Sequence, residues 1–163
     1  MFSSLEQFRS TWEHEVENTV ALLKNLTDTS LNTPIDESHR TLGRLANHLI
    51  ESVTEMPADM GLPISVQRPA HTTAEALVAD YQKTCAEFLK VLNANYTDAT
   101  LSEMRSMYGQ QWTVAYALQL LILHQTHHRG QMTVLMRQAG LTVPGMYGPS
   151  SDQWKSMGRQ PLV

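Results

Sequence analysis

Apolar residues recur every three or four positions along two stretches in the first half of the chain, which is the spacing of one face of an α-helix. The first stretch covers residues 5–26, and Ser3 with Glu6 forms a capping-box pattern that predicts the start of this helix. The second stretch covers residues 41–56. Pro57 is expected to end the second helix, because proline has no amide hydrogen for the helix interior.

The second half of the chain carries two further stretches with the same spacing. Thr72 and Glu75 form another capping-box pattern, which opens a helix predicted over residues 72–93. The last stretch lies between Thr113, a suitable N-cap residue, and Gly140, which can end a helix as a C-cap glycine. The apolar pattern therefore predicts an all-α fold.

A long segment separates the second predicted helix from the third. Residues 57–71 contain three prolines and are longer than a tight antiparallel turn requires. We therefore expect this segment to cross the length of the molecule, so that the second and third helices run parallel. A chain of 163 residues is enough for one domain with a proper core. The expected fold is a four-helix bundle with a long crossover between helices 2 and 3, in a single domain over residues 1–163.

Two other segments lack helical spacing. Residues 95–111 are expected to be irregular, with a turn at Tyr108 and Gly109. The tail, residues 141–163, contains glycines, prolines and aromatic residues without a period, and we expect it to wrap the surface and cap one end of the helices. The chain shows no internal repeat and no strand-like alternation of useful length.

Composition and charge exclude several classes of partner. The chain is 42% hydrophobic and 17% charged with a formal net charge of −4, and it has no Lys/Arg cluster, which argues against nucleic-acid and anionic-membrane binding. It lacks an apolar run long enough to span a bilayer, and its start does not resemble a secretory signal. The single cysteine, Cys85, lies in the apolar stripe of the third helix and is expected to be a small buried side chain. A cytoplasmic location is the default expectation.

The last helix contains a polar break in its apolar stripe. His124 and His128 lie one turn apart and can reach one point, while Gln125 and Arg129 fall on the stripe itself. Burying such groups without partners is unfavourable, and a metal ion would satisfy the two imidazoles. The alternative is a pair of core histidines that are hydrogen-bonded to carbonyl or carboxylate groups. His127 lies farther from the stripe and is expected to flank it or to be exposed.

A third imidazole on another helix would complete a mononuclear metal site. His48, on the flank of the second helix, is the candidate to join His124 and His128. Three neutral nitrogen ligands with an open position are typical of a catalytic centre, and imidazoles suit zinc, nickel or iron(II). Gln131 and Arg129 are candidates to orient an imidazole or to meet an anionic substrate, although Arg129 also suits a surface salt bridge.

Other chemistries lack their residues. Gln125 stands where a zincin protease would have glutamate, and the chain has neither a G-x-S-x-G elbow nor a glycine-rich phosphate loop. A di-iron bundle requires a Glu-x-x-His motif on each of two helices, whereas Glu51 follows His48 in the reverse order. No residue is assigned a direct catalytic role or a place in binding an organic cofactor.

Two segments carry a family resemblance. HQTHHRGQMTVLMRQAG, together with TLGRLANHLIES upstream, resembles the DinB-like family over nearly the whole chain, and the H-x-x-x-H-R-G-Q pattern is its most specific part. The resemblance implies an up-down-down-up four-helix bundle. It also implies a metal triad with one histidine from the second helix and two from the fourth, which match His48, His124 and His128 here.

The resemblance implies a range of activities. Some members are thiol-dependent transferases or isomerases that use bacillithiol, mycothiol or glutathione, others are described as metal-dependent hydrolases, and many form homodimers. Three hypotheses follow for this chain. It is a metal-dependent enzyme with S-transferase-type activity on a small electrophile, a metal-dependent hydrolase, or a non-catalytic dimeric metal-binding bundle.

Overall fold

The computed structural model describes residues 1–161, and this part of the chain is mostly helical with a small two-stranded antiparallel sheet. None of the helices within these residues combines the length and apolar character needed to span a bilayer. In chain order the elements are α1 (Leu5–Leu23), η1 (Thr29–Asn32), α2 (Leu42–Asp59), α3 (Ala74–Asn95), η2 (Asp98–Ser102), β1 (Met104–Met107), β2 (Gln110–Thr113), α4 (Val114–Gln138) and α5 (Ser151–Ser156).

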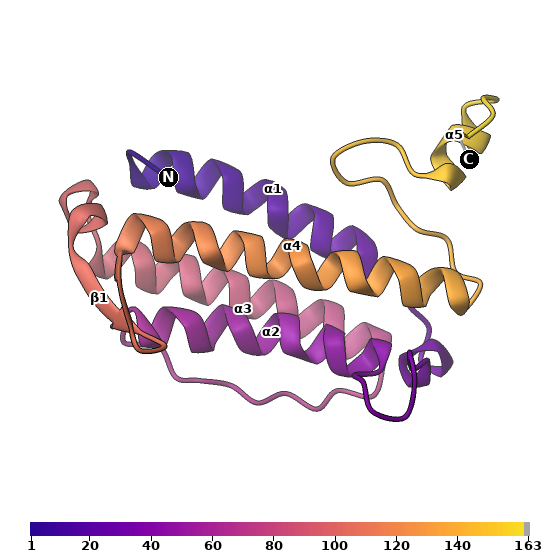
Figure 1. Ribbon diagram of the computed structural model, residues 1–163, viewed down its shortest axis with the longest axis horizontal. Helices are drawn as coiled ribbons and strands as arrows, with labels where there is room; N and C mark the ends of the chain where they lie inside the picture. The colour runs from indigo at the N-terminus through magenta and orange to yellow at the C-terminus, as the bar shows by residue number, and fades with distance from the viewer. Residues whose placement is uncertain (162–163) are drawn as a thin grey trace.

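The four long helices lie side by side (Figure 1). Helix α4 packs against both α1 and α2, and α3 packs against the same two helices from the other side. The segment between α2 and α3 runs along the length of the molecule (Figure 1), so that both helices begin at the same end. This arrangement makes α2 and α4 neighbours, and they are the two helices that carry the predicted histidines.

Aromatic residues from two helices form one part of the core. Phe8 and Trp12 of α1 contact Phe88 of α3, with ring centroids 6.1 and 5.2 Å from it in edge-on arrangements. All three are completely buried, and each large apolar side chain contributes roughly 1.5–3 kcal/mol on burial. Cys85 is also buried, as predicted, and burial raises the pKa of its thiol to about 12, which makes it a poor nucleophile.

Two helices begin one residue later than predicted. The side chain of Ser4, not Ser3, accepts a hydrogen bond from the amide of Gln7 at the start of α1. At the start of α3 the cap is Thr73, not Thr72. In both places two hydroxyl residues stand in tandem, so the pattern fits either position.

Pro57 lies inside α2 and does not end it, so that prediction was wrong. The helix continues to Asp59, and the proline falls in its last turn. A proline there removes only one amide from the ladder, while its own carbonyl still accepts a hydrogen bond from the amide of Leu62 at 3.0 Å. At the other end, Thr41 caps the helix by accepting from the amide of Arg44.

The segment predicted to be irregular contains the β1–β2 hairpin, so that prediction was wrong in part. The turn at Tyr108 and Gly109 is confirmed, because both residues have positive φ angles, 50° and 74°. Such a two-residue turn matches the twist of a hairpin. Each strand has only four residues, which is too short for a period-two pattern to stand out in the sequence.

The tail leaves α4 at Gly140, whose φ of 72° ends the helix as predicted. The chain then passes over α1 and α4, where the hydroxyl of Tyr147 bonds with Glu15. The tail also contains α5, a short helix that the sequence pattern did not predict. It begins at a capping box formed by Ser150 and Gln153 and stands apart from the long helices (Figure 1).

Candidate metal centre

The three histidines predicted as a metal-binding set lie together between α2 and α4. Nε2 of His48 is 3.1 Å from Nε2 of His124, and one ring nitrogen from each of His48, His124 and His128 lies within 4.8 Å of the other two. The four-residue spacing brings the two imidazoles of α4 together in an edge-on arrangement, with ring centroids 4.5 Å apart. The contact between α2 and α4 brings the third ring to them.

Two of the imidazoles are held by hydrogen bonds at their other ring nitrogen. Nδ1 of His48 bonds with Oε2 of Glu51 at 2.9 Å, and Nδ1 of His128 bonds with Oε1 of Gln131 at 2.7 Å. Both partners are acceptors, so each Nδ1 carries the hydrogen. Each neutral ring therefore keeps its lone pair on Nε2. In the pair of His48 and His124, Nε2 is the nitrogen of each ring that faces the other ring. Gln131, predicted as a candidate to orient an imidazole, thus contacts His128.

Glu51 is the residue that the sequence interpretation missed. Its carboxylate also accepts hydrogen bonds from Arg44 at 3.0 Å and from Arg68 at 2.7 Å. Burial raises its pKa, but the hydrogen bonds from His48 and Arg44 and the charges of the two arginines outweigh burial and lower the pKa to about 2. One feature of the sequence could have identified Glu51. It follows His48 by three residues, which places its carboxylate one helical turn from the imidazole.

Burial keeps the imidazoles neutral. His48 and His128 are 8% and 7% exposed, and desolvation lowers the pKa of each. His124 is half-buried, and desolvation together with the positive charges of the neighbouring imidazoles lowers its pKa to about 4. The neutral form is the one that binds a metal ion, so these histidines are ready for coordination at neutral pH.

The donor set fits a divalent transition-metal ion. Lone-pair nitrogens that face one another repel unless a proton or a cation lies between them. Around an ion with bonds of about 2.0–2.1 Å, tetrahedral ligand nitrogens lie about 3.4 Å apart. The 3.1 Å separation between His48 and His124 is close to that value, and His128 completes a group of three within reach of one ion.

The candidate centre lies between two cavities. One, of about 280 Å³, adjoins His128 and is lined by Ile35, Ser38, His39, Arg40, Leu45 and Gln131. The other, of about 300 Å³, adjoins His124 and is lined by Met56, Tyr108, Trp112, Leu120 and Leu123. Each cavity therefore adjoins one histidine of the cluster.

Gln125 explains part of the polar break in α4. Its side-chain amide donates to the carbonyl of Leu49 at 2.9 Å and to the hydroxyl of Ser52 at 2.8 Å. Its carbonyl accepts from the hydroxyl of Tyr81 at 3.1 Å. This buried side chain links α4 to both α2 and α3 directly beside the histidines, and all its hydrogen bonds are made within the protein.

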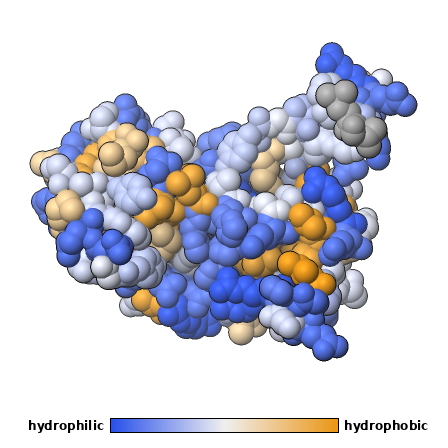
Figure 2. Space-filling model, viewed as in Figure 1, coloured by the Kyte–Doolittle hydropathy of each residue, from blue (hydrophilic) through white to orange (hydrophobic). Residues whose placement is uncertain are grey.

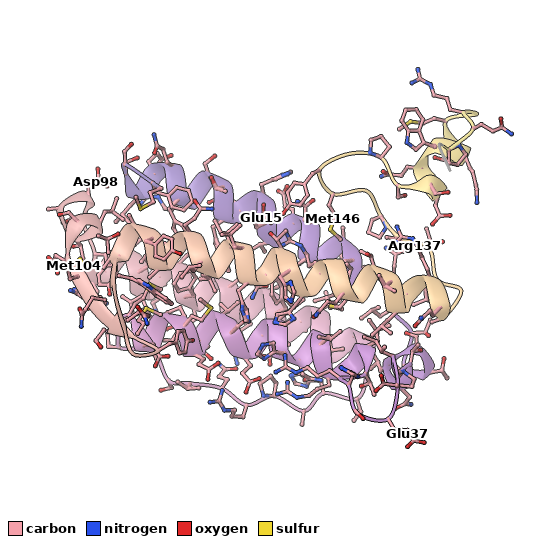
Figure 3. The ribbon with its side chains drawn as sticks, in the orientation of Figure 1. Glu15, Glu37, Asp98, Met104, Arg137 and Met146 are labelled. Atoms are coloured by element: carbon pink, nitrogen blue, oxygen red, sulfur yellow. The ribbon has the colours of Figure 1, made fainter. Side chains whose placement is uncertain are left out.

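The structure places Arg129 away from the imidazoles. Its guanidinium points to α1, where it pairs with the carboxylate of Glu15 and donates to the hydroxyl of Thr19 at 2.9 Å. Figure 3 shows Glu15 on the α1 side of α4. The alternative prediction for Arg129 was a salt bridge at the surface. The salt bridge with Glu15 does form, but Arg129 is completely buried, so the predicted surface location was wrong. His127 is exposed, as expected.

Comparison with known proteins identifies the family. The DinB family model matches residues 1–161. An uncharacterized protein of Bacillus subtilis, YrdA, is 41% identical over 161 residues, which cover 97% of this chain and 96% of that protein. The crystal structure of a DinB-like protein from Bacillus cereus superimposes with a TM-score of 0.85 at 39% identity, over 90% of this chain and 100% of that one. A DinB-like protein from Bacillus subtilis, YjoA, shares the fold with a TM-score of 0.69 at 20% identity, over 86% of this chain and 96% of that one. The chain belongs to the DinB family.

Proposed function

We propose that His48, His124 and His128 bind one divalent transition-metal ion and that the protein is a metal-dependent enzyme. The observation that carries this proposal is the convergence of three neutral imidazoles, two of them fixed through Nδ1 by acceptors. Zinc or nickel suits the all-nitrogen set best, and iron also fits it. When bound, such an ion supplies a Lewis acid that lowers the pKa of a thiol or of water at its open position.

The reaction that fits the surroundings is transfer of a small electrophile onto a thiol. Two cavities on opposite sides of the histidines give separate space to a low-molecular-weight thiol and to the electrophile. Glu51 and Gln131 hold the imidazoles of His48 and His128 in place, and the apolar side chains beside His124 offer a surface for an apolar electrophile. Hydrolysis by a metal-bound water is the alternative reaction at the same site.

We also propose that residues 1–163 form one domain, an up-down-down-up four-helix bundle, and that two copies pair. The family match over residues 1–161 and the lengthwise segment between α2 and α3 support the domain and its topology. Tyr116, Leu123 and Val134 are exposed along the outer face of α4, and Figure 2 shows apolar patches on that face. Light scattering should give twice the mass of one chain, and a single-chain mass would contradict the pairing.

Elemental analysis of the untagged protein tests the metal site. We expect one transition-metal ion per chain in the wild-type protein and in His127→Ala, because His127 is exposed and lies outside the cluster. His128→Ala should lose the ion, since two imidazoles do not complete the site. Equal metal content in the two variants, or no metal in any of the proteins after incubation with zinc and nickel salts, would contradict the proposal.

Turnover then distinguishes the reactions. A thiol-dependent transferase consumes an activated aryl halide only when both thiol and metal are present. A hydrolase cleaves an activated ester without thiol. A non-catalytic bundle does neither, but its melting temperature should fall strongly when a chelator removes the ion.

A further inference from the structure

The β1–β2 hairpin has a tyrosine at a position where hairpin turns rarely carry one. Tyr108 stands at the first central position of the turn with a φ of 50°, a left-handed backbone conformation that disfavours an aromatic side chain. Tyr108 is also 58% exposed, so burial in the core does not compensate for this conformation. An unfavourable conformation at an exposed residue points to a role beyond stabilising the fold.

Contacts with the end of α2 fix the position of the hairpin. Figure 1 shows β1 crossing this end of the long helices. Nε of Arg105 donates a hydrogen bond at 3.0 Å to the carbonyl of Met60, the C-cap residue of α2. Trp112 pairs with Arg105 in the strand register, so both side chains lie on the same face of the hairpin, the face toward α2. The hairpin therefore holds Trp112 against the helices.

Tyr108 and Trp112 form one wall of the cavity beside His124. Their ring centroids lie 6.0 Å apart in an edge-on arrangement. The other lining residues come from α2 and α4 and are Met56, Leu120, Leu123 and His124. A histidine of the candidate metal centre is thus part of the cavity wall, so a ligand held in this cavity lies next to that centre.

The character of this cavity selects a class of ligand. Its volume of about 300 Å³ suits a compound with a single ring. Among the described residues, those that line it include no carboxylate, lysine or arginine. Burial and the nearby carboxylates of Asp59 and Glu55 raise the pKa of Tyr108 to about 12, and the same carboxylates repel an anionic ligand. The surroundings therefore favour a neutral ligand.

We propose that the substrate is a neutral aromatic compound whose ring lies in this cavity, against Trp112 and Tyr108 and next to His124. Aromatic rings that pair edge-on or offset gain affinity beyond the area that they bury, which favours an aromatic ligand over an aliphatic one of equal size. The inference names the substrate class of the proposed enzyme and rests on that function for the reaction. Binding of the ring requires only the cavity.

NMR titration with three matched ligands tests the proposal, both on the protein as purified and after chelator treatment. Benzamide carries the neutral aromatic ring, cyclohexanecarboxamide replaces it with an aliphatic ring, and benzoate adds a negative charge. We expect benzamide to bind wild type about fivefold more tightly than either of the others. Trp112→Leu should abolish the preference for benzamide over cyclohexanecarboxamide. Trp154→Leu should keep it, because Trp154 lies in α5 and contacts Arg159.

The indole N–H signals locate the bound ring directly. The chain has three tryptophans, and the two variants assign the signals of Trp112 and Trp154. If Trp112→Leu does not fold, Trp112→Phe serves the assignment, and it should keep the preference for benzamide because it keeps an aromatic ring. Benzamide should shift the signal of Trp112 and leave that of Trp154 unchanged. Equal affinities of wild type for benzamide and cyclohexanecarboxamide, an equal loss in Trp112→Leu and Trp154→Leu, or an unchanged Trp112 signal would overturn the inference.

Two further outcomes separate this inference from the proposals above. Because the titrations include metal-free protein, failure of the metal proposal leaves the binding result intact, and metal binding without benzamide binding would overturn this inference alone. Leu123 also belongs to the face of α4 that is proposed to pair, so a second copy of the chain is the competing occupant of the cavity. Affinity for benzamide that falls as protein concentration drives pairing would assign the cavity to that copy and overturn the inference.

Discussion

At the scale of single residues, the tautomers of the histidines decide what the cluster can bind. The acceptor oxygens of Glu51 and Gln131 fix hydrogens on Nδ1 of His48 and His128, which leaves Nε2 free for coordination. Glu51 is in turn held by Arg44 and Arg68, so the orientation of His48 depends on a chain of charged contacts.

Replacing Glu51 with glutamine should weaken metal binding about 10- to 100-fold, the range typical of losing a carboxylate behind a ligating histidine. A competition titration against a chromophoric chelator measures this loss. The control is Glu55→Gln, which removes another carboxylate that pairs with Arg68 but does not touch His48. An affinity of Glu51→Gln equal to that of the control would show that Glu51 does not orient His48 for coordination.

At the scale of elements, contacts between side chains far apart in sequence join α1, α4 and the tail. The completely buried guanidinium of Arg129 pairs with Glu15 of α1, and the hydroxyl of Tyr147 donates to the same carboxylate at 2.6 Å. A buried charge that loses its partner is strongly destabilising, because the remaining charge is neither hydrated nor neutralised.

Glu15→Gln should therefore lower the free energy of unfolding by about 3 kcal/mol or more. Tyr147→Phe should cost only about 1 kcal/mol, because it removes a hydrogen bond and leaves the ion pair. Urea unfolding followed by circular dichroism measures both values. Glu13→Gln, on an exposed position of the same helix, should have the stability of wild type. An equally stable Glu15→Gln would refute the structural role of the pair.

The elements that could be predicted from the sequence are those in which the helical spacing of apolar residues continues over enough turns to define one face of a helix. This holds for the four long helices, for the cap at Thr113 and for the end at Gly140. The hairpin and α5 are too short to show a period. His124 and His128 could be selected because a four-residue spacing fixes a shared face, and His48 because the pair needs a third ligand. The partner of Arg129 lies 114 residues away in a different helix and leaves no local signal.

At the scale of the whole molecule, the cluster links stability to pH. In the metal-free folded protein, desolvation and neighbouring positive charges hold the pKa of His124 at about 4, against an ordinary value of 6.5. Between these values the unfolded chain binds more protons than the folded protein. The folded state therefore loses stability as pH falls from 6.5 toward 4, and His124 makes no such contribution above 6.5.

The melting temperature of chelator-treated protein should accordingly fall between neutral pH and about pH 4.5. The fall should be smaller in His124→Asn, which has no imidazole to protonate at this position. Adding zinc to the wild type should raise the melting temperature at neutral pH and make the fall steeper, because protons displace the metal ion from the imidazoles as pH drops. Parallel pH dependences for wild type and His124→Asn would show that His124 does not set this behaviour.

The hydrogen bonds of Gln125 have a kinetic consequence. They tie the backbone next to His48 to the turn of α4 that follows His124, and they do so with protein groups alone. The ligand cage is therefore assembled before any ion arrives, and loading it requires no refolding. Uptake of metal by the stripped protein should then proceed in a single step whose rate rises in proportion to ion concentration, whereas a cage built by the ion itself would reach a plateau set by chain rearrangement.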